Sequence, residues 1–503
     1  MPARQQAPRG IVSRSMVCMD VINMSKPCRM RQGFFRLKTY GGIHMKLVYD
    51  VKDRPKFKAN LVFALQQLLA IIAATLLVPT LVNLSYGKEV LNQAAALLGA
   101  GVGTLTYILF TQRKSPVFLG SSFAFISPLV GAAAFGAFGI ILGAVIAGLV
   151  YVIIALVVRF VGTKWVEKLL PPVVIGPTVA LIGLSLCGSA IKNVNNTAAG
   201  DYNLICILIG LVTFGVTVLA SVKGSKGMKL IPFIIGIAAG YVLAAIFTFI
   251  GQACEIEYLK IIDFTALTSN FAPTTFSSFI ALPEFTFVTA LKEGTSALNG
   301  VTGFVSLLAL FAPVAFVVFA EHIADHENLS TVINHDLIKD PGLHRTLLGD
   351  GVGSIVGAIF GGCPNTTYGE SVGCVAITGN ASVSTTALTA IMAILLAFFK
   401  PFIAFVNTIP TCVVGGICIA LYGFIAVSGL KMLKNVDLGE NENLFVVSAI
   451  LVTGIGGLVL QFGQIQISSI ATALIVGILT KLIVGGKKKT AVADENKENQ
   501  EAK

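Results

Sequence analysis

Charged residues are scarce in this sequence. Only 12% of its 503 residues are Asp, Glu, Lys or Arg, whereas 55% are hydrophobic. The charged share is about half of that in an ordinary soluble domain, so a water-soluble globular protein is excluded. The apolar residues form runs of roughly 17 to 25, the length that a helix needs to cross a hydrocarbon layer. Examples of such runs are Leu204–Val222, Leu230–Ile250, Val301–Ala320 and Leu444–Leu460.

Motifs for disulfides, metal binding and catalysis are also missing. The nine cysteines include no CxxC pair and no metal-ligand spacing, and most lie in or beside apolar runs, where cysteine behaves as a small hydrophobic residue. The sequence contains no HExxH motif, and no His–Asp–Ser set lies within the apolar runs. An ion channel would be expected to carry a selectivity-filter sequence, and this chain shows none. These absences favour a transporter over an enzyme or a channel, and they predict that it needs no metal and no cofactor.

The net charge of +11 indicates membrane topology, not a nucleic-acid partner. The basic residues gather in every second loop between apolar runs. Loops of the more basic set contain Arg113 and Lys114, the region 223–229 with three lysines, and the run 487–489, whereas the intervening loops hold single lysines such as Lys192. Because cytoplasmic loops carry the excess of Lys and Arg, the pattern predicts an even number of spans, with both termini in the cytoplasm and the protein in the plasma membrane.

The two ends of the chain differ from the rest. Residues 1–44 are basic and irregular and lack the apolar stretch of a signal peptide. They could be a mitochondrial presequence, although no sustained amphipathic period is present. Alternatively, translation could begin at Met45, with Gly41–His44 encoded by a ribosome-binding site. Neither hypothesis gives this leader a role in transport. Residues 487–503 are expected to form a charged cytoplasmic tail.

Weak internal similarity predicts that the chain contains a repeat. Segments around Pro79, Ser121 and Pro171 resemble later segments around Pro313, Thr366 and Pro410, in the same order and at an offset of about 240 residues. About fourteen apolar segments can be counted, and lipid requires that most of them be helical. Seven segments repeated once would give two halves of opposite topology, because a repeat with an odd number of spans must insert upside down.

Two of the apolar segments, 116–128 and 361–373, are poorly suited to a continuous helix. Both mix proline, glycine and hydroxyl residues, which disfavour uninterrupted helix. Unwound backbone at membrane depth persists only where it is buried in protein or lines a cavity. If the two segments meet, their free amides and carbonyls would form one central polar site; the alternative is a pair of loops outside the membrane.

Acidic residues beside these segments are the candidates for chemistry. Glu370 lies between apolar stretches, where a charge is costly and usually functional; the alternative is a structural pairing with a nearby hydroxyl. Glu321 follows an apolar run and could equally mark the end of that helix. However, Asp325 would share its helical face, which fits a proton and substrate pathway.

Nearby polar residues carry less specific signals. His322 and His326 would share a second face at the same helical spacing, which would suit a metal, but the HExxH pattern is missing. Asp350, within Leu348-Gly-Asp-Gly-Val-Gly, is predicted to start a helix by capping its free amides.

These motifs resemble a known family of transporters. The stretches Leu119–Pro128, Ala320-Glu-His-Ile and Pro364-Asn-Thr-Thr-Tyr-Gly-Glu370 closely resemble those of the uracil permeases in the nucleobase–cation symporter (nucleobase–ascorbate transporter) family. The similarity extends over about residues 60–485. Purine-transporting relatives carry a different Gln-Asn-containing signature in place of Asn365-Thr-Thr-Tyr, so the motif favours uracil.

The resemblance implies an all-α polytopic membrane fold of fourteen segments in two inverted repeats, with short strands in the broken segments three and ten. Segments one to four (60–160) and eight to eleven (300–399) would form a core domain. Segments five to seven (168–252) and twelve to fourteen (402–486) would form a gate domain. The resemblance also implies a homodimer in the lipid bilayer and proton-coupled uracil uptake by alternating access.

Site residues follow from the same resemblance. Glu321 and Glu370 would bind the polar edge of the pyrimidine, the amides of Phe123 and Gly369 would contact its carbonyls, and Tyr368 would line the pocket. Further pocket-lining candidates are Gln67, Ala74, Ser122 and Thr367. Glu321 is the first candidate for proton coupling, since a neutral carboxylic acid both donates and accepts. Two further candidates for proton coupling are Asp325 and His326.

Departures from the family leave part of this assignment open. Some bacterial uracil permeases have histidine at the positions of Asp325 and Gln67, so the proton route is less secure than the substrate class. A purine permease for xanthine or urate stays an alternative. So does an anion exchanger of the sulfate or bicarbonate type, although that chemistry would favour a positive residue or a bare helix N-terminus over two carboxylates.

Overall fold

The computed structural model describes residues 47–163, 165–166, 170–272, 274–298, 300–462 and 465–485. All of them belong to one structural unit, Met45–Lys503. The expected leader, residues 1–44, and the expected tail, residues 487–503, lie outside the described residues.

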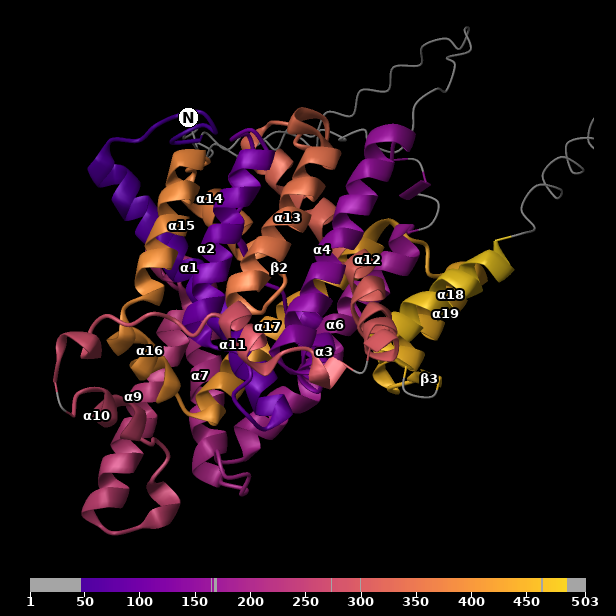
Figure 1. Ribbon diagram of the computed structural model, residues 1–503. Coiled ribbons are helices and arrows are strands. Elements are labelled where there is room, and N and C mark those ends of the chain that lie inside the picture. Colours follow the sequence, from indigo (N-terminus) through magenta and orange to yellow (C-terminus); the bar gives the residue numbers. More distant parts are fainter. Residues whose placement is uncertain are drawn as a thin grey trace, which may run out of the picture. The chain divides into compact units, whose positions relative to one another are not determined.

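Helices dominate the described chain (Figure 1). The first half contains α1 Phe57–Tyr86, α2 Gln93–Phe110, α3 Ile126–Ala133, α4 Gly136–Val161, α6 Pro172–Asn195, α7 Leu204–Val222, α8 Lys226–Leu230 and α9 Pro232–Ala253. The region between the halves contains α10 Thr265–Asn270 and α11 Thr286–Glu293. The second half contains α12 Gly300–Ile333, α13 Leu343–Gly361, α14 Gly369–Thr378, α15 Val383–Ala397, α16 Lys400–Asn407, α17 Thr411–Met432, α18 Asn441–Ile455 and α19 Ser469–Val484.

Eight of the described helices are long and apolar enough to cross a membrane: α1, α2, α4, α6, α7, α9, α12 and α17. Shorter apolar helices lie at Phe123–Ala133 and at α15, α18 and α19. The run Leu204–Val222 forms α7 with the predicted bounds, because Asn203 caps it by accepting from the amides of Ile205 and Cys206. The count of fourteen segments stays a prediction.

Helix α12 continues well beyond the apolar run from which it was predicted. It extends to Ile333, and His322, Asp325 and His326 on its second half are buried. The alternative that Glu321 marks the end of this helix is therefore wrong, because the helix continues to Ile333 and these three polar residues pack inside the protein.

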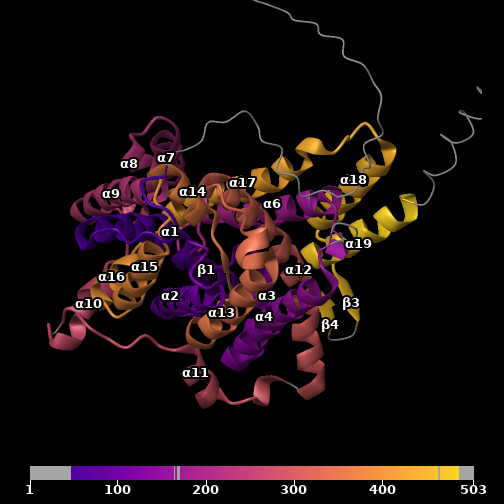
Figure 2. The same cartoon turned by 90° about the horizontal axis from the view of Figure 1, so that it is seen from above.

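Both broken segments contain a short strand. Strands β1, Leu119–Ser121, and β2, Asn365–Thr367, are antiparallel, and Gly120 is paired with Thr366. Each strand supplies the partners for the other's backbone, so this extended chain can remain fully buried. Figure 2 shows β1 among helices from both halves, and it contacts α1 and α2. A second antiparallel pair, β3 Leu460–Phe462 and β4 Ile465–Ile467, precedes α19.

The helices pack in two groups. In the first, α13 packs on α2 and α4, α15 on α1 and α2, and α12 on α4. In the second, α17 packs on α6 and α7, α7 on α9, and α18 on α6 and α19. The segments that echo each other in sequence take similar places: Pro79 lies inside α1 and Pro313 inside α12, and α6 and α17 both begin directly after a proline.

Candidate functional site

A cavity of about 360 Å³ lies where the two groups of helices meet beside the strands. Its size falls within the usual range of small-molecule sites. Residues from the two broken segments and α12 form one side of the lining, and residues from α6, α9 and α17 contribute the other. The lining also includes Ser221, Lys229 and Met432, which lie near the ends of α7, α8 and α17.

Eight of the predicted site residues line this cavity: Ser122, Phe123, Glu321, Asp325, Thr367, Tyr368, Gly369 and Glu370. Three do not. Gln67 and Ala74 are buried in α1, and His326 is buried in α12. The structure thus brings together residues more than 240 positions apart, because β1 and β2 pair directly.

Each strand leads into a helix at the cavity. β1 is followed by a short 3₁₀ helix, Phe123–Phe125, and then by α3, while β2 is followed by α14. The amides of Ser371 and Val372 donate to the carbonyl of Tyr368. The amides of Gly369 and Glu370, at the first two positions of α14, have no acceptor within their helix. The Glu370 amide donates to the Glu370 carboxylate itself. The free Gly369 amide, with the positive end of the helix dipole, favours an electron-rich atom of a ligand.

Three carboxyl groups converge on the cavity. Glu321 and Asp325 lie one turn apart on α12, and Glu370 starts α14. Thr367 Oγ1 donates to Asp325 Oδ2 at 2.8 Å. In the described part of the chain, no Lys or Arg forms an ion pair with any of the three. If all three were ionised, they would repel one another without compensation.

Aromatic residues support the strands and one wall. The Tyr368 hydroxyl donates to the carbonyl of Ser121 at 2.9 Å, so this ring ties β2 to β1. Gly120 lies directly against the ring, since a Cβ built there would be 2.2 Å from Tyr368 ring carbons. The Phe123 ring meets the Tyr422 ring edge-on, with centroids 6.4 Å apart.

Gln67 supports the site from behind. Its Nε2 donates to Ser371 Oγ at 3.0 Å, and its Oε1 accepts from Thr389 Oγ1 at 3.0 Å. Ser371 Oγ also accepts from the amide of Phe118 at 3.1 Å. Gln67 therefore fixes the residue that follows Glu370. Sequence reasoning missed Ser371, because a serine beside an acid carries no distinctive pattern.

The prediction that Asp350 starts a helix is wrong. Asp350 lies inside α13, which begins at Leu343, and its side chain is only 1% exposed. Its Oδ2 lies 2.7 Å from His322 Nδ1 on α12. The surrounding glycines suggested a helix start, but here they allow α13 to approach its neighbours: a Cβ on Gly353 would be 2.7 Å from the carbonyl oxygen of Gly103.

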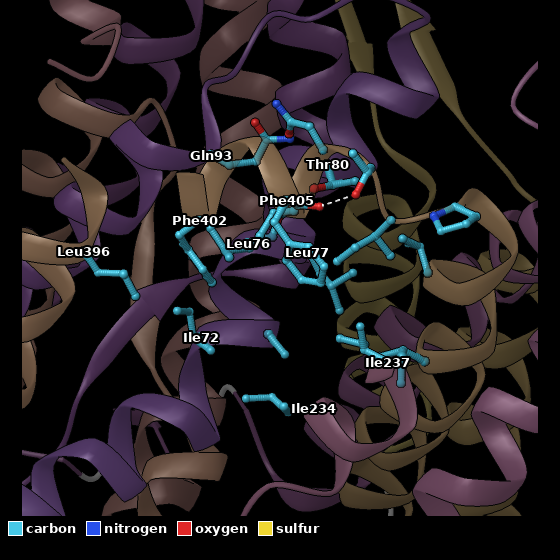
Figure 3. A pocket seen from close by; sticks show the side chains of 18 of the residues that line it. Ile72, Leu76, Leu77, Thr80, Gln93, Ile234, Ile237, Leu396, Phe402 and Phe405 are labelled. Atoms are coloured by element: carbon cyan, nitrogen blue, oxygen red, sulfur yellow. Dashed lines mark hydrogen bonds between the residues drawn. The ribbon is translucent and has the colours of Figure 1, made fainter. Parts of the chain in front are cut away.

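A larger cavity of about 1100 Å³ lies between α1, α9, α15, α16 and α17 (Figure 3). Side chains such as Ile72, Leu76, Ile234, Phe402 and Phe405 make it largely apolar, and none of the predicted site residues lines it. Polar recognition of a small ligand requires several convergent polar groups, so the smaller cavity is the better candidate site.

The sequence of this chain is similar to those of known proteins. A family model described as "Permease family" matches residues 58–462. The uracil permease of Bacillus caldolyticus is 38% identical over 450 residues, which cover 89% of this chain and 96% of that protein. The uracil permease of Escherichia coli (strain K12) is 34% identical over 445 residues, covering 86% and 93%.

Solved structures are similar in fold. The transmembrane domain of the cyanobacterial bicarbonate transporter BicA matches with a TM-score of 0.54 and 13% identity, covering 86% of this chain and 100% of that domain. The structure of SLC26A9 matches with a TM-score of 0.54 and 14% identity, covering 86% and 66%. At such identities the likeness concerns the fold alone.

Proposed function

The chain belongs to the Permease family, and from this premise we propose that it carries uracil into the cell together with protons, by alternating access. It is a multi-pass membrane transporter and not an enzyme. The relatives that match along most of its length are named uracil permeases.

The observation that carries the substrate proposal is the meeting of carboxyl groups and free amides in one cavity. Uracil presents two ring N–H donors and two carbonyl acceptors around a flat ring. Glu321 and Glu370 can accept from the N–H groups, and the amides of Phe123 and Gly369 can donate to the carbonyls. Tyr368 and Phe123 add apolar ring contact. Every polar edge of uracil then has a complementary partner.

We assign the transported proton to Glu321. Asp325 already accepts a hydrogen bond from Thr367, whereas Glu321 faces the cavity and is half-buried. Three unpaired carboxylates in one cavity disfavour full ionisation, so a proton that enters with uracil would relieve repulsion. His326 was a further candidate, but its ring contacts Tyr107 and does not line the cavity; we leave it out of the route.

We further propose the architecture that the sequence predicts: fourteen segments in two inverted repeats, with core and gate domains at the boundaries given above. The two packing groups and the antiparallel pairing of β1 with β2 support it. The cavity reaches Lys229 and Ser221, beside the basic loop 223–229. With that loop in the cytoplasm, this part of the lining would lie on the cytoplasmic side. The homodimer and the cytoplasmic termini stay predictions.

Anion exchange fits this site less well, despite the likeness in fold to a bicarbonate transporter. Three acidic residues line the cavity, and Lys229 is the one cationic residue in its described lining. An anion would be repelled by ionised carboxylates.

Radiolabelled uracil uptake in cells that lack their own permease tests the proposal. We expect saturable uptake that a protonophore collapses and that excess unlabelled uracil inhibits, whereas xanthine and bicarbonate do not. Cells carrying the empty vector give the background. If well-expressed protein takes up xanthine or an inorganic anion instead of uracil, the substrate proposal fails and the fold stands.

Replacing Gly120 by alanine should damage the site while sparing the fold. The new methyl group would overlap the Tyr368 ring and push it off Ser121, so we expect KM for uracil to rise at least about tenfold, a loss near 1.4 kcal/mol. Gly373→Ala is the matched control, since Gly373 lines the same cavity with nothing within 4 Å of its added Cβ. An unchanged KM for Gly120→Ala would show that the ring position is unimportant.

A further inference from the structure

Behind the candidate site, Asp350 and His322 form a buried acid–histidine pair. Asp350 Oδ2 and His322 Nδ1 are 2.7 Å apart, and the side chains are 1% and 0% exposed. His322 directly follows Glu321 on α12, but neither member of the pair lines the cavity. The pair therefore joins α12 to α13 next to the site without reaching it.

Hydrogen-bond accounting points to an extra proton on this pair. Thr346 Oγ1 donates to the carbonyl of Leu343 at 3.0 Å, and it also lies 3.0 Å from His322 Nε2. A threonine hydroxyl has a single hydrogen. Once that hydrogen points to Leu343, His322 Nε2 must carry a proton and donate to Thr346. The contact between Nδ1 and Oδ2 then needs a second proton, on either the imidazole or the carboxyl group.

The competing arrangement leaves an uncompensated charge. If Thr346 donated to Nε2, a neutral His322 would donate from Nδ1 to an ionised Asp350, and the pair would carry one negative charge. In the part of the chain that the structure describes, Asp350 has His322 as its ion-pair partner and no Lys or Arg, and its Oδ1 has no hydrogen-bond partner. A buried, unpaired carboxylate is strongly disfavoured.

Among the described residues, the surroundings of the pair supply no Lys or Arg. Tyr151 on α4 faces the His322 ring, with centroids 6.2 Å apart, and Tyr107 on α2 contacts His326. The other titratable neighbours among the described residues are Glu321, Asp325 and His326 on α12. An ionised Asp350 would therefore add to an acidic cluster.

His326 is the other group that could hold the proton. Its Nδ1 lies 2.8 Å from the carbonyl oxygen of His322 and is therefore protonated, while its Nε2 lies 2.7 Å from the Tyr107 hydroxyl. Tyr107 also donates to Ser115 at 2.8 Å, and if its hydrogen stayed there, His326 would be an imidazolium. However, no carboxylate contacts this ring in the described chain, whereas His322 shares its proton with Asp350 directly.

We propose that Asp350 and His322 share one proton and act as a neutral positioning pair, which holds α12 in register with α13. Glu321 and Asp325 are thereby aimed into the cavity from a helix that is fixed through its neighbouring face. The pair keeps a further negative charge away from the three acids of the site, so the proton that moves in transport stays on those acids.

Ring ¹⁵N NMR of histidine-labelled, full-length protein in lipid nanodiscs tests the proton directly. The chain has five histidines, so His322→Phe and His326→Phe assign the two signals. We expect a proton on His322 Nε2 at neutral pH, next to a His326 ring with a proton on Nδ1 only. A bare His322 Nε2, with or without an imidazolium at His326, overturns the proposal. This readout does not depend on the substrate.

Uptake by two Asp350 variants gives the second test, which rests on the proposed uracil transport. Asp350→Asn stays neutral and keeps a donor for His322, so we expect uptake within about threefold of wild type and an unchanged pH profile; Asp350→Ala should lose about tenfold or more. If folded Asp350→Asn protein loses uptake as severely as Asp350→Ala, the negative charge itself is required and the pair is not neutral. Absence of uracil uptake by the wild type would instead refute the proposed function and leave the NMR result valid.

Discussion

Glu370→Gln is expected to abolish uracil uptake. Glu370 sits at the first turn of α14 and lines the cavity together with Gly369, whose amide is free. Its carboxylate is proposed to accept from a ring N–H of uracil. A hydrogen bond to a charged group contributes about 1.5–3 kcal/mol. If the NH2 group of the new glutamine faces the ring N–H of uracil, two hydrogen-bond donors also oppose each other. We therefore expect a fall of at least about 100-fold in kcat/KM, measured by initial rates at matched expression.

Glu321→Gln should give a different loss. Glutamine imitates the protonated acid, so binding of uracil should persist within a few-fold, while accumulation against a gradient and its response to a protonophore should disappear. Binding to purified protein and uptake into cells separate the two effects. Glu327→Gln is the matched control, because Glu327 lies on the same helix but is exposed and does not line the cavity. If Glu327→Gln were as damaging as either site variant, the effect would come from the helix and not from the site.

These acids could be found from the sequence because charge is rare in it. Glu370 lies between apolar stretches, where an acid is costly and usually functional, whereas Glu321 follows an apolar run and Asp325 shares its helical face. The broken segments were visible for a similar reason, because proline, glycine and hydroxyl residues cluster in them. The structure places strands in both segments and brings their ends to the cavity.

Other contacts had no local signal. Gln67 reaches Ser371 across 304 positions, and Tyr107 reaches His326 across 219. Asp350 looked like a helix cap because glycines flank it, and only the packing of α13 on α2 and α4 shows why glycines are there. Such pairs depend on tertiary packing, which no spacing along the chain encodes. The register between β1 and β2 also could not be read from the sequence. It matters because a one-residue slip would turn each side chain to the opposite face.

Gly183→Ala is expected to unfold or severely destabilise the protein. Gly183 on α6 lies against α17, and a Cβ built there would be 2.3 Å from the carbonyl oxygen of Tyr422 and 2.7 Å from the amide nitrogen of Ala426. Both atoms belong to helix backbone, which cannot move aside without separating the two helices. Overpacking of this kind costs about 1–3 kcal/mol or more.

The same pair of helices forms one wall of the cavity, since Val179 and Ile182 of α6 and Leu421 and Ile425 of α17 line it. Gly183→Ala should therefore reduce uptake together with the apparent Tm. Gly188→Ala is the matched control within α6, where an added Cβ meets nothing within 4 Å; it should be neutral or stabilise by about 0.5–1 kcal/mol, because alanine is the better helix former. Thermal unfolding in detergent, followed by size-exclusion chromatography, gives the apparent Tm of each of the two variants. Equal Tm values for the two variants would show that α6 and α17 can separate freely, and the close approach of these helices would then not stabilise this wall of the cavity.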